Sequence, residues 1–193
     1  MSHFANSISL EKRKDTQSIA MIVILISVGM LFAALFLGYT VLRFSQKTWP
    51  PQIFEKIEFT FPIISTIAIL FSSISFEFMK RSYLELNKNK FMGLWLLTFN
   101  LGLAFFVSQI FLWRELNLNG LLVSSGIFAS VIHGFTWIHA AHMFIAMLAL
   151  FYLTRLFKKD IEDKYFHWFS NVEKLWHFLG VIWLLMFVFL FVI

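Results

Sequence analysis

The chain has 193 residues and a formal net charge of +5, from 16 basic and 11 acidic residues. Hydrophobic residues make up 59% of it, aromatic residues 19%, and 26 residues are phenylalanine, whereas a soluble domain is about 45–50% apolar. Because one soluble core could not bury this excess, the composition predicts a membrane protein. Cysteine is absent, which excludes disulfides, thiolate metal sites, haem attached through cysteine and cysteine nucleophiles.

Five apolar runs follow one another along the chain, after a polar and basic tail at 1–17. Each run is long enough to cross a bilayer as a helix, which takes about 20 residues. The runs are continuous rather than alternating, which disfavours barrel strands. The expected helices cover about 18–44, 59–79, 91–113, 121–157 and 172–193. The sequence therefore predicts an all-α integral membrane bundle of five transmembrane helices, folded as a single domain over 18–193.

Basic residues concentrate in the tail, in the loop between the second and third runs, and in the loop between the fourth and fifth. These segments share one side of the membrane if each run crosses it once. The positive-inside rule then predicts a cytoplasmic N-terminus and a periplasmic C-terminus, in a multi-pass protein of the bacterial cytoplasmic (inner) membrane. The same distribution explains the net charge without a nucleic-acid partner.

Sequence patterns of common enzymes and transporters are missing. The chain has no phosphate-binding G-x-x-x-x-G-K-[ST], no G-x-G-x-x-G, no H-E-x-x-H and no G-x-S-x-G. A proton pump or ion-coupled transporter keeps ionisable groups at the bilayer midplane. Glu77, Glu115 and Glu173 instead lie near the ends of runs or in a loop, so a transporter is disfavoured.

Four histidines lie in the apolar runs, and they raise the question of a ligand. His139 and His142 are three residues apart, which places them on one face of a helix. His133 precedes them, and His177 lies in the fifth run. A b-type haem between His142 or His139 and His177 is one interpretation. The other, which the residues favour, is that these imidazoles hold helices together.

Short motifs occur in a fixed order along nearly the whole chain. The stretch 31–44 ends in Tyr-x-x-x-Arg with Arg43, and 101–113 carries Gln109 after Leu-Gly-x-x-Phe. The stretch 175–183 reads Trp-His-Phe-x-x-x-x-Trp, with Trp176, His177 and Trp183. Between and before them lie Trp-Pro-Pro at 49–51, a Thr and a Ser-Ser pair in 61–73, and the paired histidines in 136–142. In this order and spacing the chain resembles subunit III of haem-copper terminal oxidases, in its short five-helix form.

The chain departs from that family mainly at acidic positions. Val28 follows Ser27 where the family has a buried carboxylate, and Gly180 stands where it has an aspartate. Leu112 or Trp113 replaces a glutamate, and Trp137 replaces a glycine beside the first histidine. The packing motifs are therefore kept and the acidic ones are lost.

The resemblance implies an accessory subunit of a proton-pumping respiratory oxidase that reduces O2 to water. It implies no catalytic, cofactor-binding or metal-binding residue in this chain, with haem and copper held by partner subunits. The implied partners are oxidase subunit I as the main contact, subunit II, bound phospholipids and a larger respiratory supercomplex. The chain would stabilise subunit I and its lipid and proton-uptake environment.

The same resemblance gives a structural or contact role, toward lipid or other subunits, to a defined set of residues: His139, His142, Trp176, His177, Trp183, Gln109 and Arg43. Two alternatives stay open at this point. One is a subunit III-like partner of a nitric oxide reductase. The other, of a different class, is a haem-b membrane cytochrome that uses His142 and His177.

Overall fold

The computed structural model describes residues 2–47, 49–51, 54, 59–157 and 165–192, with side chains from residue 16 onward except those of 155–157. The charged loop expected between the fourth and fifth helices lies outside the described residues. The long helices are α1 (Ser2–Ser45), α2 (Thr60–Leu84), α3 (Lys88–Leu118), α4 (Ile127–Phe157) and α5 (Phe166–Phe187). Two short helical segments, η2 (Val123–Ser125) and η4 (Val188–Val192), complete the described secondary structure, which is entirely helical.

Five of the described helices are long and apolar enough to cross a membrane, in line with the predicted all-α, five-helix class. Their ends differ from the predicted ones because apolarity marks the part of a helix in lipid, not the whole helix. The backbone of α1 is helical from Ser2, through a stretch of good helix formers around 10–14. Helix α3 begins after Asn87, whose side-chain oxygen accepts a hydrogen bond from the Lys90 N–H at 3.1 Å as an N-cap.

The fourth run is shorter as a helix than its apolar length suggests. Helix α4 begins at Ile127, and the residues before it form η2 and a turn. Gly126 has a φ of 156°, far from the helical value of about −63°, so the helix begins only after it. The predicted start at residue 121 is therefore six residues too early.

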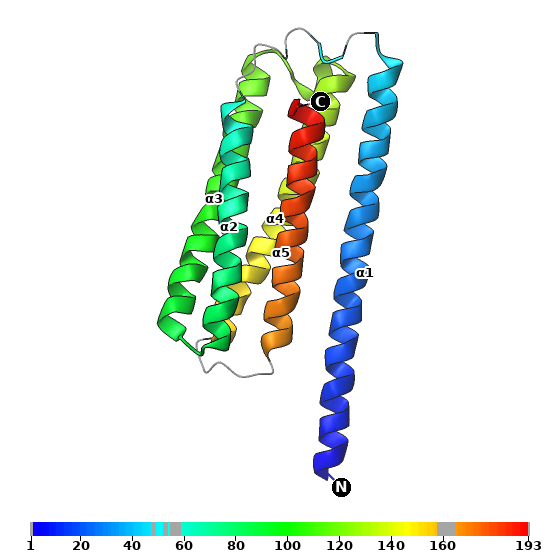
Figure 1. The fold of residues 1–193 in the computed structure, drawn as a ribbon. Helices are drawn as coiled ribbons and strands as arrows, with labels where there is room; N and C mark the ends of the chain where they lie inside the picture. Colours follow the sequence, from blue (N-terminus) through cyan, green and yellow to red (C-terminus); the bar gives the residue numbers. More distant parts are fainter. Residues whose placement is uncertain (1, 48, 52–53, 55–58, 158–164, 193) are drawn as a thin grey trace.

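Figure 1 shows α2 and α3 side by side as an antiparallel pair, with α4 and α5 packed against them. Helix α1 stands at the edge of the bundle, and its N-terminal part extends past the other helices. The two termini lie at opposite ends of the molecule. Only 6% of the most apolar window of α1 is buried inside the protein, against 33–50% for the other four spans. Helix α1 is therefore the span most open to lipid or to a partner.

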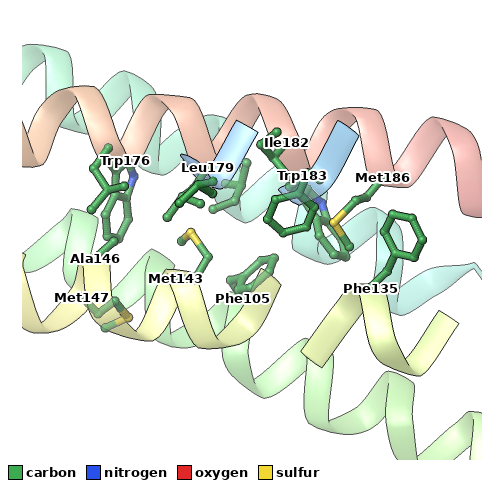
Figure 2. Packing of buried hydrophobic residues seen from close by; sticks show 14 of the residues in the cluster. Phe105, Phe135, Met143, Ala146, Met147, Trp176, Leu179, Ile182, Trp183 and Met186 are labelled. Atoms are coloured by element: carbon green, nitrogen blue, oxygen red, sulfur yellow. The ribbon is translucent and has the colours of Figure 1, made fainter. Parts of the chain in front are cut away.

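The core forms where α3, α4 and α5 meet. Figure 2 shows Met143 and Ala146 of α4 pointing toward Trp176, Leu179 and Trp183 of α5. These side chains are buried, as are Phe105 on α3 and Phe32 on α1. Gly102 allows this close approach, because a Cβ there would lie 3.0 Å from Met147 Sδ and 3.1 Å from the Trp176 ring. The core thus fixes where α5 can lie against α3 and α4.

Candidate functional site

His139 occupies the centre of the bundle and is fully buried. Its ring lies 5.7 Å from that of Phe105 on α3, 5.5 Å from Trp183 on α5 and 6.0 Å from Phe32 on α1, between centroids. Neither ring nitrogen has a hydrogen-bond partner among the described residues. The imidazole of α4 therefore joins α1, α3 and α5 through ring contacts among the described residues, and not through hydrogen bonds.

His142 is partly exposed and has a different environment. Its Nδ1 lies 2.7 Å from the carbonyl oxygen of Ile138, one turn earlier on α4. Since a carbonyl only accepts, Nδ1 carries the proton. The ring also meets Phe32 edge-on at 5.8 Å. The fully buried Phe32 thus lies against both histidines, and this contact holds α1 to α4.

Two indole N–H groups fasten α5 to α2. Trp176 Nε1 donates to Ser72 Oγ at 3.1 Å, and Trp183 Nε1 donates to Thr66 Oγ1 at 3.0 Å. Both tryptophans are fully buried, and both belong to the motif at 175–183. Hydrogen bonds between buried polar side chains hold neighbouring helices in a membrane where the hydrophobic effect gives no such preference.

Gln109 belongs to the contact between α3 and α2. Its Nε2 donates to Ser65 Oγ at 2.8 Å, and Ser65 in turn hydrogen-bonds Ser108. Its Oε1 is buried and has no partner among the described residues. A further bond at the same interface joins Thr98 to Ser75, at 2.9 Å. Gln109 therefore acts within the chain, between two of its own helices.

Three further contacts were not anticipated from the sequence. Trp95 Nε1 donates to the Leu150 carbonyl at 2.9 Å, and Trp113 Nε1 donates to Thr136 Oγ1 at 2.9 Å. His133 Nε2 lies 3.0 Å from the Leu121 carbonyl, which ties the start of α4 to the link before it. A tryptophan in an apolar run signals burial or a membrane interface, but no sequence pattern gives its partner 55 residues away.

Arg43 and His177 lie apart from the contacts just described. Arg43 is in the last turn of α1, and its Nη1 is buried without a hydrogen-bond partner among the described residues. His177 is partly exposed on α5, with its ring 6.0 Å from that of Phe76 on α2. The predicted set of residues is thus not one site. Its members are distributed over several helix contacts, and three of them, Arg43, His142 and His177, are partly exposed.

The arrangement around His139 is suited to holding helices and poorly suited to binding a porphyrin. Rings of Phe32, Phe105 and Trp183 surround the imidazole, so an iron ligated by it would have to displace at least one of them. Trp176, Trp183 and Gln109 each donate a hydrogen bond to a side chain on α2 of the same chain. These residues build the framework of the bundle.

Comparison with known proteins identifies the family. The family model for cytochrome c oxidase subunit III matches residues 10–193. The cytochrome c oxidase subunit 3 of Thermostichus vulcanus is 26% identical over 184 residues, which is 93% of this chain and 88% of that protein. The subunit 3 of Synechocystis is 25% identical, over 90% of this chain and 74% of that protein. That of Rattus norvegicus is 29% identical, over 72% and 53%.

The family match covers all five spans and the motifs described above, from α1 through α5. The resemblance read from the sequence is therefore confirmed, and the respiratory chain is the setting that the family implies. The protein belongs to the cytochrome c oxidase subunit III family, whose members are subunits of an enzyme complex.

Proposed function

We propose that this chain is the accessory subunit III of a proton-pumping respiratory haem-copper oxidase that reduces O2 to water. The observation that carries the proposal is the family match over residues 10–193. In this role the chain stabilises subunit I and its lipid and proton-uptake environment, and it takes no part in the chemistry. Haem and copper belong to the partner subunits.

The packing of the polar residues supports a role as a scaffold. His139 is enclosed by aromatic rings, and the indole groups of Trp176 and Trp183 bond to α2. Side chains used in this way set the shape of the bundle, which a partner subunit would recognise. His142, His177 and Arg43 are partly exposed, so they are the members of the predicted set that can contact lipid or another subunit.

The proposed partners are subunit I as the main contact, subunit II and bound phospholipids, within the complex or a larger respiratory supercomplex. The exposed side of α1 supports an extensive contact in the plane of the membrane. Met30 and Leu37 are 68% and 67% exposed, and seven residues apart they lie on one face of the helix. A face of this kind is stable only against lipid chains or another apolar helix.

The proposed location is the bacterial cytoplasmic (inner) membrane, with the N-terminus in the cytoplasm and the C-terminus in the periplasm. The position of the two termini at opposite ends of the bundle is consistent with five crossings (Figure 1). Basic residues are concentrated in the N-terminal tail and in the two loops expected on the same side of the membrane. This distribution supports a cytoplasmic position for that side.

The proposal is tested by purifying the chain from its native membrane in mild detergent. Visible spectra of the complex and of the separated chain are recorded, and the co-purified subunits are identified. We expect oxidase haem bands in the complex, a colourless separated chain, and subunits I and II among the partners. Co-purification with nitric oxide reductase subunits would replace the oxidase by that enzyme. A haem band that stays with the separated chain would overturn the scaffold role.

A further inference from the structure

A second group of polar residues lies where the C-terminal half of α2 meets the N-terminal half of α5. It consists of Glu77 and Lys80 on α2 and of Glu173 and His177 on α5. One carboxylate oxygen of each glutamate and one ring nitrogen of His177 all lie within 4.8 Å of one another. Lys80 Nζ donates to Glu173 Oε1 at 2.8 Å. Four ionisable groups from two spans therefore converge on one point.

The charges of this group do not balance. Two carboxylates face one ammonium group, so the group carries one net negative charge when His177 is neutral. Glu173 is only 6% exposed, and a buried carboxylate is costly unless its charge is compensated. Lys80 supplies one compensating charge, but its side chain is 33% exposed and can reach toward solvent. A bound cation would supply the charge that is missing.

The donor set selects the kind of cation. Glu173 and His177 are four residues apart, which places them on one face of α5, and Glu77 faces them from α2. Imidazole together with carboxylate oxygen suits zinc and neighbouring transition metals, whereas calcium and magnesium prefer oxygen ligands alone. Tetrahedral ligands around zinc lie roughly 3.3–3.5 Å apart. Rotations of the flexible glutamate side chains can bring the three donors from 4.8 Å or less to that spacing.

We propose that Glu77, Glu173 and His177 form a binding site for a divalent transition-metal cation, with zinc the best fit. The three residues leave a fourth position for water, and the metal joins α2 to α5. In the metal-free protein, Lys80 pairs with the Glu173 carboxylate. When the metal binds that carboxylate, the Lys80 side chain turns toward solvent.

The test uses the full chain in lipid nanodiscs, purified without a histidine tag and treated with a chelator. Zinc binding is measured by calorimetric titration. We expect one zinc site in the unsubstituted chain, weakened at least about tenfold by the loss of one ligand in Glu77→Gln or in His177→Gln. Glu85→Gln is the matched control, because Glu85 lies at the same end of α2 and pairs with Lys90. Equal zinc affinity in Glu77→Gln and Glu85→Gln would overturn the proposal.

Two further measurements keep the test decisive if those variants fold poorly. Lys80→Gln removes the competing ammonium group, so zinc should bind about tenfold more tightly to it; an unchanged or weaker affinity speaks against the site. X-ray absorption at the zinc edge should give one imidazole per zinc. Two or more imidazoles would place the metal elsewhere, at a histidine pair, and would also overturn the assignment.

Discussion

His139 places an imidazole among three aromatic rings, with both nitrogens unpartnered among the described residues. A buried polar group without a partner costs free energy, and an apolar group of the same shape does not. We therefore expect His139→Phe to keep or raise the free energy of unfolding of the chain. His139→Ala leaves a cavity, so we expect it to lower that free energy by about 2–4 kcal/mol. Thermal unfolding followed by circular dichroism measures both changes.

The haem spectrum of the purified complex serves as the second readout for these two variants. A structural histidine leaves the haem bands of the complex unchanged in His139→Phe. Loss of a haem band, or a large loss of stability in His139→Phe alone, would mean that the ring nitrogens have a partner in the assembled complex.

The bond between Trp183 and Thr66 is a direct contact between α5 and α2, at 3.0 Å. Hydrogen bonds of this kind in membrane proteins couple by about 0.6 kcal/mol. In a double-mutant cycle with Trp183→Phe and Thr66→Val, the two changes should therefore cost less together than the sum of the single variants. Unfolding in mixed detergent micelles measures the coupling, and strictly additive effects would show that the bond contributes nothing.

At the scale of the helices, Gly102 controls how closely α3 approaches α4 and α5. A larger side chain there would collide with Met147 and with the Trp176 ring. Gly93 lies on the same helix with open space around it. We expect Gly102→Leu to separate the helices and to lower the yield of folded chain, whereas Gly93→Leu should be tolerated. Size-exclusion chromatography and thermal unfolding compare the two variants, and equal behaviour would contradict the packing described here.

The number of helices could be predicted from the sequence, but their ends and partners could not. In a bilayer every backbone polar group must be bonded internally, so a long apolar run has to be a helix. Apolarity does not mark where a helix continues into water, which is why α1 and α3 exceed their predicted ranges. Nor does it say which faces meet. Trp95 reaches Leu150, and Lys80 reaches Glu173, through a packing that no local pattern encodes.

The same limit applies to the candidate site. The motifs singled out Trp176, Trp183 and Gln109, and the structure gives each of them a hydrogen-bond partner on α2. The sequence showed no paired carboxylates within a span. Glu77 and Glu173 are separated along the chain, and only the meeting of α2 with α5 brings them together. The motifs that carry the family resemblance contain neither Glu77 nor Glu173, so they could not indicate this pair.

At the scale of the whole molecule, α1 contacts both α4 and α5, from Gln17, whose carbonyl accepts a hydrogen bond from Asn171 Nδ2 at 3.4 Å, to Tyr39, whose ring lies near that of Phe189. Phe32 packs against the two histidines of α4, and Val28 and Tyr39 are buried on the same side. The N-terminal part of α1 extends past the bundle (Figure 1). Val28, where the resemblance expects a buried carboxylate, lies in this packed contact, where a charge would be buried. The chain thus uses this position for packing between its helices.

The direction in which the bundle crosses the membrane can be tested with single cysteines. The chain has no cysteine, so single cysteines report accessibility without background. Asn89, in the first turn of α3, and Ser124, in η2, are both exposed. The start of α3 and the start of α4, which follows η2, lie at opposite ends of the bundle (Figure 1). Since basic residues favour the cytoplasm, a membrane-impermeant maleimide added to spheroplasts should label Ser124→Cys and leave Asn89→Cys unlabelled. Inside-out vesicles should give the reverse pattern. Labelling of Asn89→Cys from outside would invert the topology and, with it, the side from which zinc would reach Glu77.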